Sequence, residues 1–440
     1  MSSISPARRT AFAILLAIDK GRGHSDDLLR SKEVASLSPL DRNLATALVL
    51  GTLRWQIDLD RRIRPLLKHP NAKLEPEVLI VLRLGVFQLL HMDRIPARAA
   101  IDESVELAKQ SGHRFASGMV NAVLRKLAAS PAAPAADFRQ AYLSWMVERW
   151  TAFFGEATTC AVCRYGQAQP VVSIRLNGSE AEAELTAEGV ALRPGEILRA
   201  ARQVLSADVT HTAAFCEGRV RIQDEGSQLI AELTPRGRKI LDCCAAPGGK
   251  TLILAERNPD ARIVACESNS RRERELRHRL SPLGSRIECR LADAAALEDD
   301  AAFDVVLADV PCSGTGTLGR NPEIRHRLQQ DDLSRQAARQ QAILHSALRA
   351  VRPGGSVIYS TCSLEPEENQ QVVNAVLSES KDAQIVSLQA RIEELRTDGI
   401  LTAAGANCLL QCITPEGFLR LLPGILQTDG FFAALLTKTA

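Results

Sequence analysis

Hydrophobic residues recur at helical spacing throughout the first 129 residues. Phe12 and Leu15 share one face of a predicted first helix, and Pro76 stands in the first turn of another over Glu77–His91. The alternating pattern of a strand does not occur in this stretch of sequence. The sequence therefore predicts an all-α N-terminal domain.

A spacer rich in proline and alanine, residues 130–137, follows these helices and has the composition of a domain boundary. After it come an aromatic helical segment at Tyr142–Phe154, a strand-like run at Val171–Leu176 and a helical stretch from Glu180. This mixture predicts a small α+β module. The predicted domains are a helical domain at 1–130, the small module at 138–225 and a third domain at 226–440.

Strands and helices alternate from about residue 226 onward. A long helix is predicted over Ser334–Val351, and Gly430–Thr437 is predicted to be an edge strand. Such alternation is typical of an α/β fold with a parallel, doubly wound sheet, whose ligand lies at the carboxyl ends of the strands. The other predicted strands are Lys239–Cys243, Arg262–Glu267, Arg286–Arg290, Phe303–Asp309 and Ser356–Cys362.

Positive charge is concentrated near the N-terminus. The whole chain of 440 residues carries a formal net charge of only +2, but residues 1–130 hold 20 Lys and Arg against 13 Asp and Glu. A basic module favours a polyanionic partner such as a nucleic acid, although an ordinary basic surface explains the count equally well. Aromatic residues make up only 4% of the chain, which disfavours extended stacking of bases on aromatic side chains.

The eleven cysteines do not follow a disulfide framework. Their number is odd and their spacing is irregular, which favours a reducing compartment. The pairs Cys160/Cys163 and Cys408/Cys412 lack a nearby second pair of cysteine or histidine ligands, so no metal site is predicted.

The first apolar segment is not expected to be a signal sequence. Asp19 and Lys20 follow it directly and no small-residue cleavage site is apparent, so an amphipathic helix fits better. Arg83 interrupts the most apolar stretch, and no run reaches the roughly 18 residues that span a membrane. We therefore expect a cytoplasmic protein without a membrane partner.

A glycine-rich turn follows the first strand of the third domain. The segment Cys243-Cys-Ala-Ala-Pro-Gly-Gly-Lys-Thr251 opens a helix, and its small residues let backbone amides approach a ligand closely. The phosphate loop of nucleotide hydrolases requires glycine five residues before Gly249, where this chain has Cys244. Nucleoside triphosphate binding is therefore disfavoured, and a turn without any ligand is the alternative.

Two carboxylates follow the next two predicted strands. Glu267 stands 18 residues after Gly249, where dinucleotide-binding folds keep an acid for the ribose hydroxyls. Asp293 could accept a hydrogen bond from an adenine amino group. Either residue could instead be an exposed acid at a strand end, so their interpretation depends on the glycine-rich turn.

Two further strands each end near a cysteine. Cys312 stands three residues after Asp309 in the segment Asp-Val-Pro-Cys-Ser-Gly-Thr-Gly, and Cys362 ends the strand that begins at Ser356. A single cysteine at a strand end is usually a small buried hydrophobic residue. Two at matching positions, one beside Asp-x-Pro, indicate a reactive pair at the ligand-binding edge.

Paired cysteines suit methylation at carbon-5 of cytosine. This carbon is a poor nucleophile, but a thiolate that adds to carbon-6 makes carbon-5 enamine-like, so that it can attack a methyl group. Sulfur needs only a modestly lowered pKa to react. A base must then remove the proton from carbon-5, and an acid such as Asp309 can hydrogen-bond the pyrimidine while charge develops.

These motifs resemble those of the RNA 5-methylcytosine methyltransferases. The likeness covers residues 244–251, 309–316 and 361–369. It implies a Rossmann-like methyltransferase domain, with Cys362 as the nucleophile, Cys312 assisting product release and S-adenosylmethionine as methyl donor. Glu267 replaces the family's usual aspartate but keeps the carboxylate. The cofactor contacts that the resemblance implies are Cys244, Ala245, Ala246, Pro247, Gly248, Gly249, Lys250, Glu267, Asp293 and Asp309.

The N-terminal helices resemble a NusB-like RNA-binding domain. The segments Arg42-Asn-Leu-Ala, Leu84-Gly-Val-Phe-Gln-Leu and Val120-Asn-Ala-Val-Leu-Arg carry this likeness. Such a domain joined to this core is similar to the bacterial 16S ribosomal RNA cytosine-5 methyltransferases, which implies 16S rRNA as substrate and a monomer without a stable protein partner. Asn321-Pro-Glu-Ile-Arg325 also fits, and Arg325 is expected to meet the substrate backbone.

Two other functions stay open on the sequence. The protein could be a non-enzymatic RNA-binding factor with a degenerate core, or a methyltransferase for proteins or small molecules. Intact Lys250, Asp309 and both cysteines argue against the first, and a nucleophilic cysteine would have no purpose in the second. The basic segment Arg271–Arg279 is interpreted as the solvated face of a helix rather than as an RNA contact.

Overall fold

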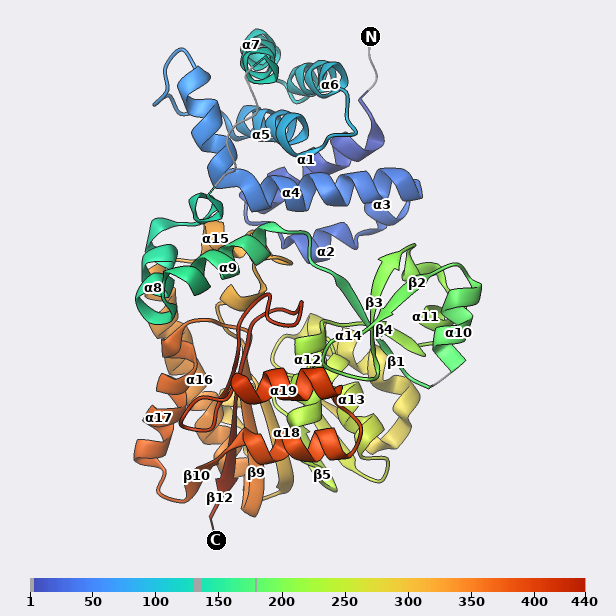
Figure 1. Ribbon diagram of the computed structural model, residues 1–440, viewed down its shortest axis with the longest axis vertical. Coiled ribbons are helices and arrows are strands. Elements are labelled where there is room, and N and C mark those ends of the chain that lie inside the picture. The colour runs from blue at the N-terminus through green and yellow to red at the C-terminus, as the bar shows by residue number, and fades with distance from the viewer. Residues whose placement is uncertain (1–3, 130–136, 179, 440) are drawn as a thin grey trace. The chain divides into compact units, whose positions relative to one another are not determined.

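The computed structural model describes residues 4–129, 137–178 and 180–439. The chain forms two compact units, whose elements Figure 1 labels. The helical unit contains residues 1–169 together with 318–327, and the α/β unit contains residues 170–317 and 328–440. Within the described ranges, no helix is both long and apolar enough to span a bilayer.

Helices make up the described part of the helical unit, as the sequence predicts. The longest is capped by Ser38, whose hydroxyl accepts a hydrogen bond from the amide of Asp41 at 3.1 Å. The elements are α1 (Pro6–Asp19), α2 (Ser25–Leu29), α3 (Lys32–Ala35), α4 (Pro39–Ile63), α5 (Pro76–His91), α6 (Ala97–Gln110), α7 (Ser117–Ala128), α8 (Ser144–Phe154), α9 (Glu156–Gln167) and α15 (Ile324–Arg327), with 3-10 turns at Arg64–Leu66, Arg114–Ala116 and Phe138–Ala141.

The long helices of this unit approach one another closely because glycines stand where they cross. A Cβ atom on Gly85 of α5 would lie 2.7 Å from Leu124 of α7. One on Gly51 of α4 would lie within 1.9 Å of the Phe87 ring on α5. Both positions therefore require a residue without a side chain. The unit closes around one apolar core as a result.

A segment from far along the chain completes the helical unit. Arg325 of α15 is fully buried there and stacks its guanidinium 4.1 Å from the ring centre of Tyr142. The expectation that Arg325 meets the substrate backbone is wrong, because a buried guanidinium that donates to backbone carbonyls cannot reach a phosphate. Those carbonyls belong to Arg54, Ala141, Gly166 and Leu318.

The α/β unit alternates strands and helices after residue 225, as predicted. Its first elements are β1 (Val172–Leu176), α10 (Glu180–Ala187), β2 (Ala191–Pro194), β3 (Ala201–Ser206), α11 (Ala213–Cys216) and β4 (Val220–Ile222). The elements that follow are α12 (Glu225–Leu233), β5 (Lys239–Asp242), α13 (Gly249–Arg257), β6 (Arg262–Glu267), α14 (Ser270–Leu280), β7 (Ile287–Leu291), β8 (Phe303–Asp309), α16 (Gln330–Ala350), β9 (Val351–Thr361), α17 (Gln370–Glu379), β10 (Ala383–Val386), α18 (Leu388–Thr397), α19 (Ala403–Gln411), β11 (Leu419–Leu421) and β12 (Phe431–Lys438).

The large sheet has the strand order β10-β12-β9-β8-β5-β6-β7, and β11 pairs with β12. Strands β5 to β9 run parallel, whereas β12 is antiparallel to β9. In this register Asp242 lies opposite Leu307, and Asp309 lies opposite Ser360. The carboxyl ends of β5, β8 and β9 therefore meet at one edge of the sheet, where a doubly wound fold binds its ligand.

Helices cover both faces of this sheet, and side chains of alternate strand positions enter two separate cores. Ile240, Val305 and Ile358 pack on one face with α12, α13, α18 and α19. Val306 and Tyr359 pack on the other face with α16 and α17, which lie beside each other in Figure 1. The predicted fold class is confirmed: helical at the N-terminus, a small α+β module, and a doubly wound α/β core.

The prediction that Gly430–Thr437 forms an edge strand is wrong. Strand β12 covers nearly the same residues but lies between β9 and β10, with Phe432 opposite Thr361 and Leu436 opposite Val357. Its apolar run is buried on both faces, which is typical of an interior strand. An interior β12 reaches the site edge through Gly430, whose amide donates to the carbonyl of Gly316 at 2.9 Å.

The small module is a four-stranded antiparallel sheet with the order β2-β3-β1-β4. Helices α10 and α11 complete its own apolar core around Ile174 and Leu185. The helices α8 and α9 belong to the helical unit instead. The division into domains at 1–130, 138–225 and 226–440 stays a prediction.

Candidate active site

The two predicted cysteines lie next to each other at the sheet edge. The sulfur atoms of Cys312 and Cys362 are 3.3 Å apart, within hydrogen-bond distance for a thiol. Cys362 follows β9 directly, and Cys312 follows β8, the neighbouring parallel strand. Both side chains are half-buried. Two sulfur atoms at this separation can share a proton, so one thiol can help its neighbour to ionise.

A buried glutamate ties the two cysteine loops together. Glu368 is fully buried, and its Oε1 accepts hydrogen bonds from the amide of Ser313 at 2.8 Å and from the Gln340 side chain at 3.0 Å. Its Oε2 accepts hydrogen bonds from the hydroxyls of Ser313 and Ser363. Each serine directly follows one of the cysteines. A single carboxylate thereby fixes the spacing between both thiols.

Backbone contacts also hold the Cys312 loop against the Cys362 loop. The amide of Gly316 donates to the carbonyl of Cys362 at 2.9 Å. A Cβ atom on Gly316 would lie 2.5 Å from the carbonyl oxygen of Gly430 and 2.8 Å from that of Cys362. Only glycine permits this approach, so the glycine of the Cys-Ser-Gly-Thr-Gly segment is explained by close packing.

Lys250 and Asp309 form an ion pair beside the cysteines. The Lys250 ammonium lies 2.7 Å from Asp309 Oδ2, and the Ser360 hydroxyl donates to Asp309 Oδ1 at 2.7 Å. Burial by itself would lower the pKa of Lys250, but the Asp309 carboxylate and the Cys362 sulfur raise it. Lys250 therefore keeps its positive charge and can stabilise a thiolate at Cys362.

Cys312 holds its proton more strongly than an ordinary thiol. The hydrogen bond with Cys362, together with burial, raises the pKa of Cys312 well above its usual value. At neutral pH Cys312 is therefore a thiol, and its S–H can donate to the sulfur of Cys362.

The predicted glycine-rich turn connects β5 to α13. Gly248 has a φ of 100°, which favours glycine, and the amide of Ala245 donates to the carbonyl of Cys266 at 2.8 Å. Cys244 and Ala246 are half-buried, whereas Pro247 is exposed. Helix α13 begins at Gly249. Its N-terminal amides thus face the sheet edge, where the helix dipole favours a negatively charged ligand group.

The second predicted contact, Glu267, lies at the end of β6. Its Oε1 accepts a hydrogen bond from the amide of Asn269 at 2.9 Å, and its Oε2 lies 3.4 Å from the guanidinium of Arg272. Arg272 also donates to the carbonyl of Ala246 at 3.0 Å. Arg272 therefore links the glycine-rich turn to the carboxylate, although its helix was expected to be only a solvated face.

Asp293 occupies the turn after β7. Its Oδ1 accepts a hydrogen bond from the amide of Ala295 at 3.0 Å, and no described residue bonds to its Oδ2. The residue is exposed. Strands β6 and β7 are parallel neighbours, so Asp293 and Glu267 follow adjacent strand ends on the same edge.

Asp242, for which no role was predicted from sequence, ends β5 beneath this turn. Its Oδ2 accepts a hydrogen bond from the Thr251 hydroxyl at 2.7 Å, and the residue is almost fully buried. Burial raises the pKa of Asp242 to about 6. The buried acid therefore supports the start of α13 from below.

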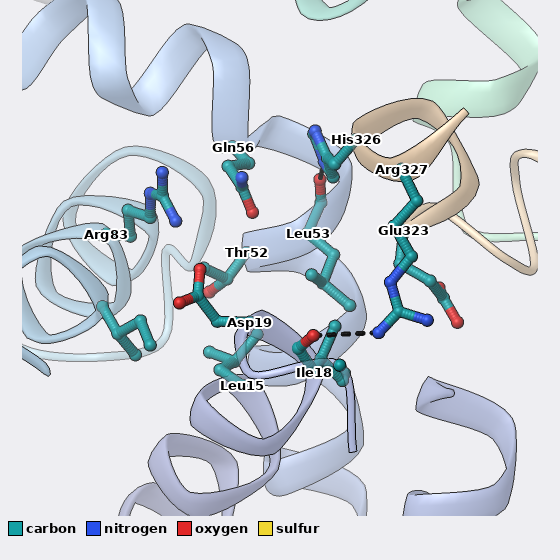
Figure 2. Close-up of a pocket in the computed structure, with 12 residues that line it drawn as sticks. Leu15, Ile18, Asp19, Thr52, Leu53, Gln56, Arg83, Glu323, His326 and Arg327 are labelled. Carbon is teal, nitrogen blue, oxygen red and sulfur yellow. Dashed lines mark hydrogen bonds between the residues drawn. The ribbon is translucent and has the colours of Figure 1, made fainter. Parts of the chain in front are cut away.

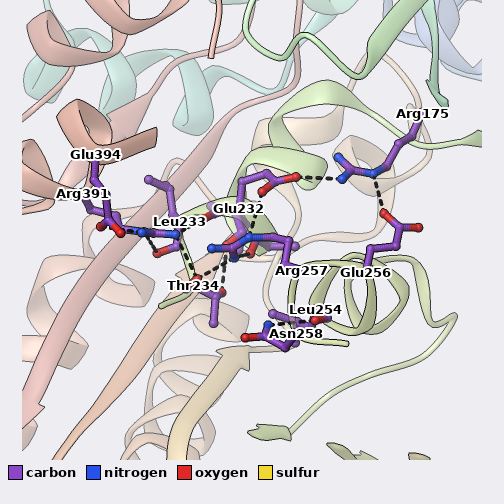
Figure 3. Close-up of polar contacts among 12 residues, drawn as sticks. Arg175, Glu232, Leu233, Thr234, Leu254, Glu256, Arg257, Asn258, Arg391 and Glu394 are labelled. Carbon is purple, nitrogen blue, oxygen red and sulfur yellow. Dashed lines mark hydrogen bonds and ion pairs between the residues drawn. The ribbon is translucent and has the colours of Figure 1, made fainter. Parts of the chain in front are cut away.

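Helices α12 and α13 are joined by buried charges, which Figure 3 shows. Glu232 of α12 accepts from Arg175 at 2.8 Å and pairs with Arg257 of α13 at 3.0 Å. Arg175 also reaches Glu256 of α13 at 3.0 Å. Arg175 lies on β1, so the small module is bound to the helix whose first turn follows the glycine-rich loop. This network fixes the position of α13 at the site.

Comparison with known proteins decides the family. Residues 230–437 match the model of the 16S rRNA methyltransferase RsmB/F family, and residues 5–129 match the NusB family. The "Probable ribosomal RNA small subunit methyltransferase B" of Bacillus subtilis is 31% identical, over 98% of each chain. The chain belongs to the ribosomal RNA small subunit methyltransferase B family.

Other relatives agree with this family. The ribosomal RNA small subunit methyltransferase B of Xanthomonas campestris is 32% identical over 99% of this chain and 97% of its own. The crystal structure of a methyltransferase homologue from Pyrococcus horikoshii shares 27% identity and a TM-score of 0.54, covering 68% of this chain and 95% of its own. As a member of the family, the enzyme methylates ribosomal RNA and uses S-adenosylmethionine. The alternatives of a non-enzymatic RNA-binding factor and of a methyltransferase for proteins or small molecules are set aside.

The residues at the sheet edge fit S-adenosylmethionine. Glu267 offers a buried carboxylate oxygen at the place of a ribose, and Asp293 has an available oxygen at the next strand end. The glycine-rich turn would meet the amino-acid end of the cofactor with backbone amides. When bound, the cofactor supplies an electrophilic methyl group on sulfur.

The sequence pattern indicated the cysteines, Lys250 and Asp309 but not three supporting residues. Glu368 lies in a segment that drew notice only for its likeness to a family motif. Asp242 and Arg272 carry no motif signal of their own. Only one sequence feature could have indicated a role for Asp242. It is an acid at the end of an apolar strand, directly before a glycine-rich turn.

Proposed function

We propose that the enzyme methylates carbon-5 of a cytosine in 16S rRNA through a covalent adduct between that cytosine and Cys362. The observation that carries this proposal is the pair of sulfur atoms 3.3 Å apart, beside the ion pair of Lys250 and Asp309. Methylation of a ribose hydroxyl or of an exocyclic amine does not require any thiol. Two thiols at one edge suit a reaction that both forms and breaks a bond to sulfur.

Cys362 is the proposed nucleophile. Its sulfur lies 3.3 Å from the Cys312 sulfur, whose thiol can donate a hydrogen bond to it. The thiolate forms a bond to carbon-6 of the cytosine, and the electron pair of the 5,6 double bond becomes available at carbon-5. Carbon-5 then takes the methyl group, and S-adenosylhomocysteine leaves.

Asp309 and Lys250 are proposed to hold the cytosine ring during addition. Asp309, with Oδ1 already fixed by Ser360, can accept a hydrogen bond from the cytosine amino group or from its protonated ring nitrogen. This contact disperses the charge that the addition of sulfur places on the ring. The ion pair with Lys250 at 2.7 Å keeps the carboxylate oriented.

Cys312 is proposed to act at the release of the product. A base must remove the proton from carbon-5, after which the bond between Cys362 and carbon-6 breaks and the 5,6 double bond forms again. Cys312 lies against the sulfur that leaves, where its thiol can donate to the departing thiolate. Its raised pKa keeps that proton available at neutral pH.

The experiment that tests this function identifies the methylated nucleoside. Protein-free 16S rRNA and isolated small subunits are incubated with the enzyme and labelled cofactor, digested to nucleosides and analysed by mass spectrometry. We expect 5-methylcytidine from the wild type, and a loss of at least about 1000-fold in rate for Cys362→Ala. The exposed Cys216→Ala serves as the matched control. Label in any other nucleoside, or full activity of Cys362→Ala, contradicts the proposal.

The predictions of a monomer without a stable protein partner and of a cytoplasmic location are part of this proposal. Light scattering of the purified enzyme measures the first, and fractionation of cells measures the second. A monomeric mass is expected at micromolar concentration.

A further inference from the structure

A cavity of about 470 Å³ lies in the helical unit. Figure 2 shows side chains from α1, α4 and α15 around it. Leu15, Ile18, Leu53 and Ile80 give it apolar walls. The volume lies within the usual range of pockets for small ligands. A nucleobase has flat apolar faces that suit such walls.

Polar groups of α4 face the same space. Thr52 is only 1% exposed, and its hydroxyl oxygen has no hydrogen-bond partner among the described residues. Gln56 lies one helical turn further along and is half-buried, and Asp19 is exposed at the end of α1. A buried hydroxyl without a partner destabilises the fold, because it has lost its hydrogen bonds to water. Its presence at a cavity wall points to a polar ligand.

The wall of the cavity that residues 323–327 form is held rigid by hydrogen bonds within the helical unit. Glu323 accepts from the amide and the hydroxyl of Ser25 at 2.9 Å. The His326 ring lies 2.7 Å from the carbonyl of Leu53, and Arg327 donates to the carbonyls of Ile18 and Gly23 at 2.9 Å. This wall therefore exists before any ligand binds, which lowers the entropic cost of binding.

We propose that this cavity binds one unstacked nucleotide of the ribosomal RNA. The base would lie between the apolar walls, and its polar edge would meet Thr52, Gln56 and Asp19. A hydroxyl, an amide and a carboxylate at one edge can satisfy the mixed donors and acceptors of a base, whereas a purely apolar ligand would leave them unpaired. The basic charge of residues 1–130 suits the phosphates of the same strand.

One wall of the cavity lies close to a proposed catalytic cysteine along the chain. Glu323, His326 and Arg327 follow Cys312 within 15 residues of sequence. A nucleotide in the cavity therefore contacts the chain segment that leads away from a proposed catalytic cysteine. The site would secure the RNA through one nucleotide while another is methylated.

The test compares RNA binding by cavity variants of the full-length enzyme. Thr52→Val and Gln56→Met keep the shape of the side chains but remove their hydrogen bonds. We expect each to weaken the binding of 16S rRNA by about 3- to 10-fold, with kcat and the affinity for S-adenosylmethionine unchanged. Thr46→Val on the same helix, whose hydroxyl donates to the Arg42 carbonyl, is the matched control. Should Thr52→Val fail to fold, Gln56→Met carries the test.

A second measurement locates the nucleotide. The enzyme is irradiated with 4-thiouridine-substituted 16S rRNA, and the cross-linked peptides are identified by mass spectrometry. Cross-links at residues 15–21 or 52–56 that diminish in Gln56→Met support the site. Binding unchanged in both variants, or cross-links in the helical unit that avoid these segments, overturns it. Because the readout is RNA binding, the result does not depend on which atom of the RNA is methylated.

Discussion

The two units bury charged side chains in different ways. In the α/β unit the buried Glu368 accepts hydrogen bonds from the two cysteine loops and from Gln340 of α16. In the helical unit the buried Arg325 donates to four backbone carbonyls and stacks on Tyr142. The first arrangement sets the distance between two sulfur atoms, whereas the second holds one chain segment in place.

A buried charge can therefore fix the spacing between two loops, or it can attach a distant segment of the chain. A carboxylate that joins the two cysteine loops would control the proposed reaction directly, because both cysteines move with their serines. A guanidinium that donates to four carbonyls depends mainly on the backbone, with one side-chain contact in its stacking on Tyr142. Substitution of Glu368 should therefore affect chemistry more than stability, and substitution of Arg325 should do the reverse.

Of the changes that test this comparison, Glu368→Ala is expected to have the largest effect. Without the carboxylate, Ser313 and Ser363 lose their common acceptor and the sulfur atoms separate. We expect kcat to fall about 100- to 1000-fold while the affinity for S-adenosylmethionine is unchanged. Glu368→Gln, which keeps one acceptor oxygen, should recover part of the activity. The exposed Glu379→Ala is the control. Equal losses in kcat and cofactor affinity would show that Glu368 only supports folding.

Arg325→Met should act mainly on the stability of the helical unit. The substitution removes the guanidinium that donates to four buried carbonyls, which we expect to lower the free energy of unfolding by about 3 kcal/mol. Hydrogen exchange of amides in α4 and α9 measures this change. The exposed Arg335→Met should leave exchange unaltered. Protection that persists in α4 and α9 of Arg325→Met would disprove the attachment role.

Acid should affect the two units in opposite directions. Burial lowers the pKa of His91 and of His326 to about 4, so the helical unit loses stability as pH falls from 6.5 toward 4. Burial raises the pKa of Asp242 to about 6, so its ionisation destabilises the α/β unit as pH rises from about 4 through 6. From these shifts, each of the three groups should contribute about 3 kcal/mol.

Hydrogen exchange between pH 4 and 7 separates these two contributions. Protection in α5 should decrease toward pH 4, and Asp242→Asn should remove the pH-dependent loss of protection in β5. A parallel response of both helices and strands, unaltered by Asp242→Asn, would rule out these assignments.

The smallest effect is expected at Arg272. This residue links Glu267 to the carbonyl of Ala246 from an exposed helix, where solvent weakens its ion pair. Arg272→Gln should raise the dissociation constant for S-adenosylmethionine about 2- to 5-fold without changing kcat. Calorimetry measures the constant, and Arg271→Gln on the same helix is the control. A loss of more than about 100-fold would mean that Arg272 contacts the cofactor itself.

The parallel strands were predictable from sequence because short apolar runs that end in glycine-rich turns are typical of buried strands in α/β folds. The position of β12 was not predictable, because the sequence of an apolar strand does not show whether the strand lies at the edge or in the interior of a sheet. The expectation for Arg325 was wrong because a basic residue in a short polar segment usually faces solvent. Its burial depends on carbonyls that lie up to 271 residues away along the chain.

The candidate site could be predicted as far as its reactive residues. Cys312 and Cys362 follow strands that the pattern predicted, and parallel strands bring their carboxyl ends together. Glu368 could not be assigned a role in advance, because its partners Ser313 and Gln340 are 55 and 28 residues away. Contacts of this kind arise from the folded arrangement and leave no local pattern.

The most direct test of the covalent mechanism traps the bond between protein and RNA. Cys312→Ala is incubated with 16S rRNA and S-adenosylmethionine, and the protein is separated under denaturing conditions and digested. We predict a stable protein–RNA adduct whose nucleotide is attached to the peptide that contains Cys362. An adduct on any other residue, or none at all while methylation continues, would contradict the account.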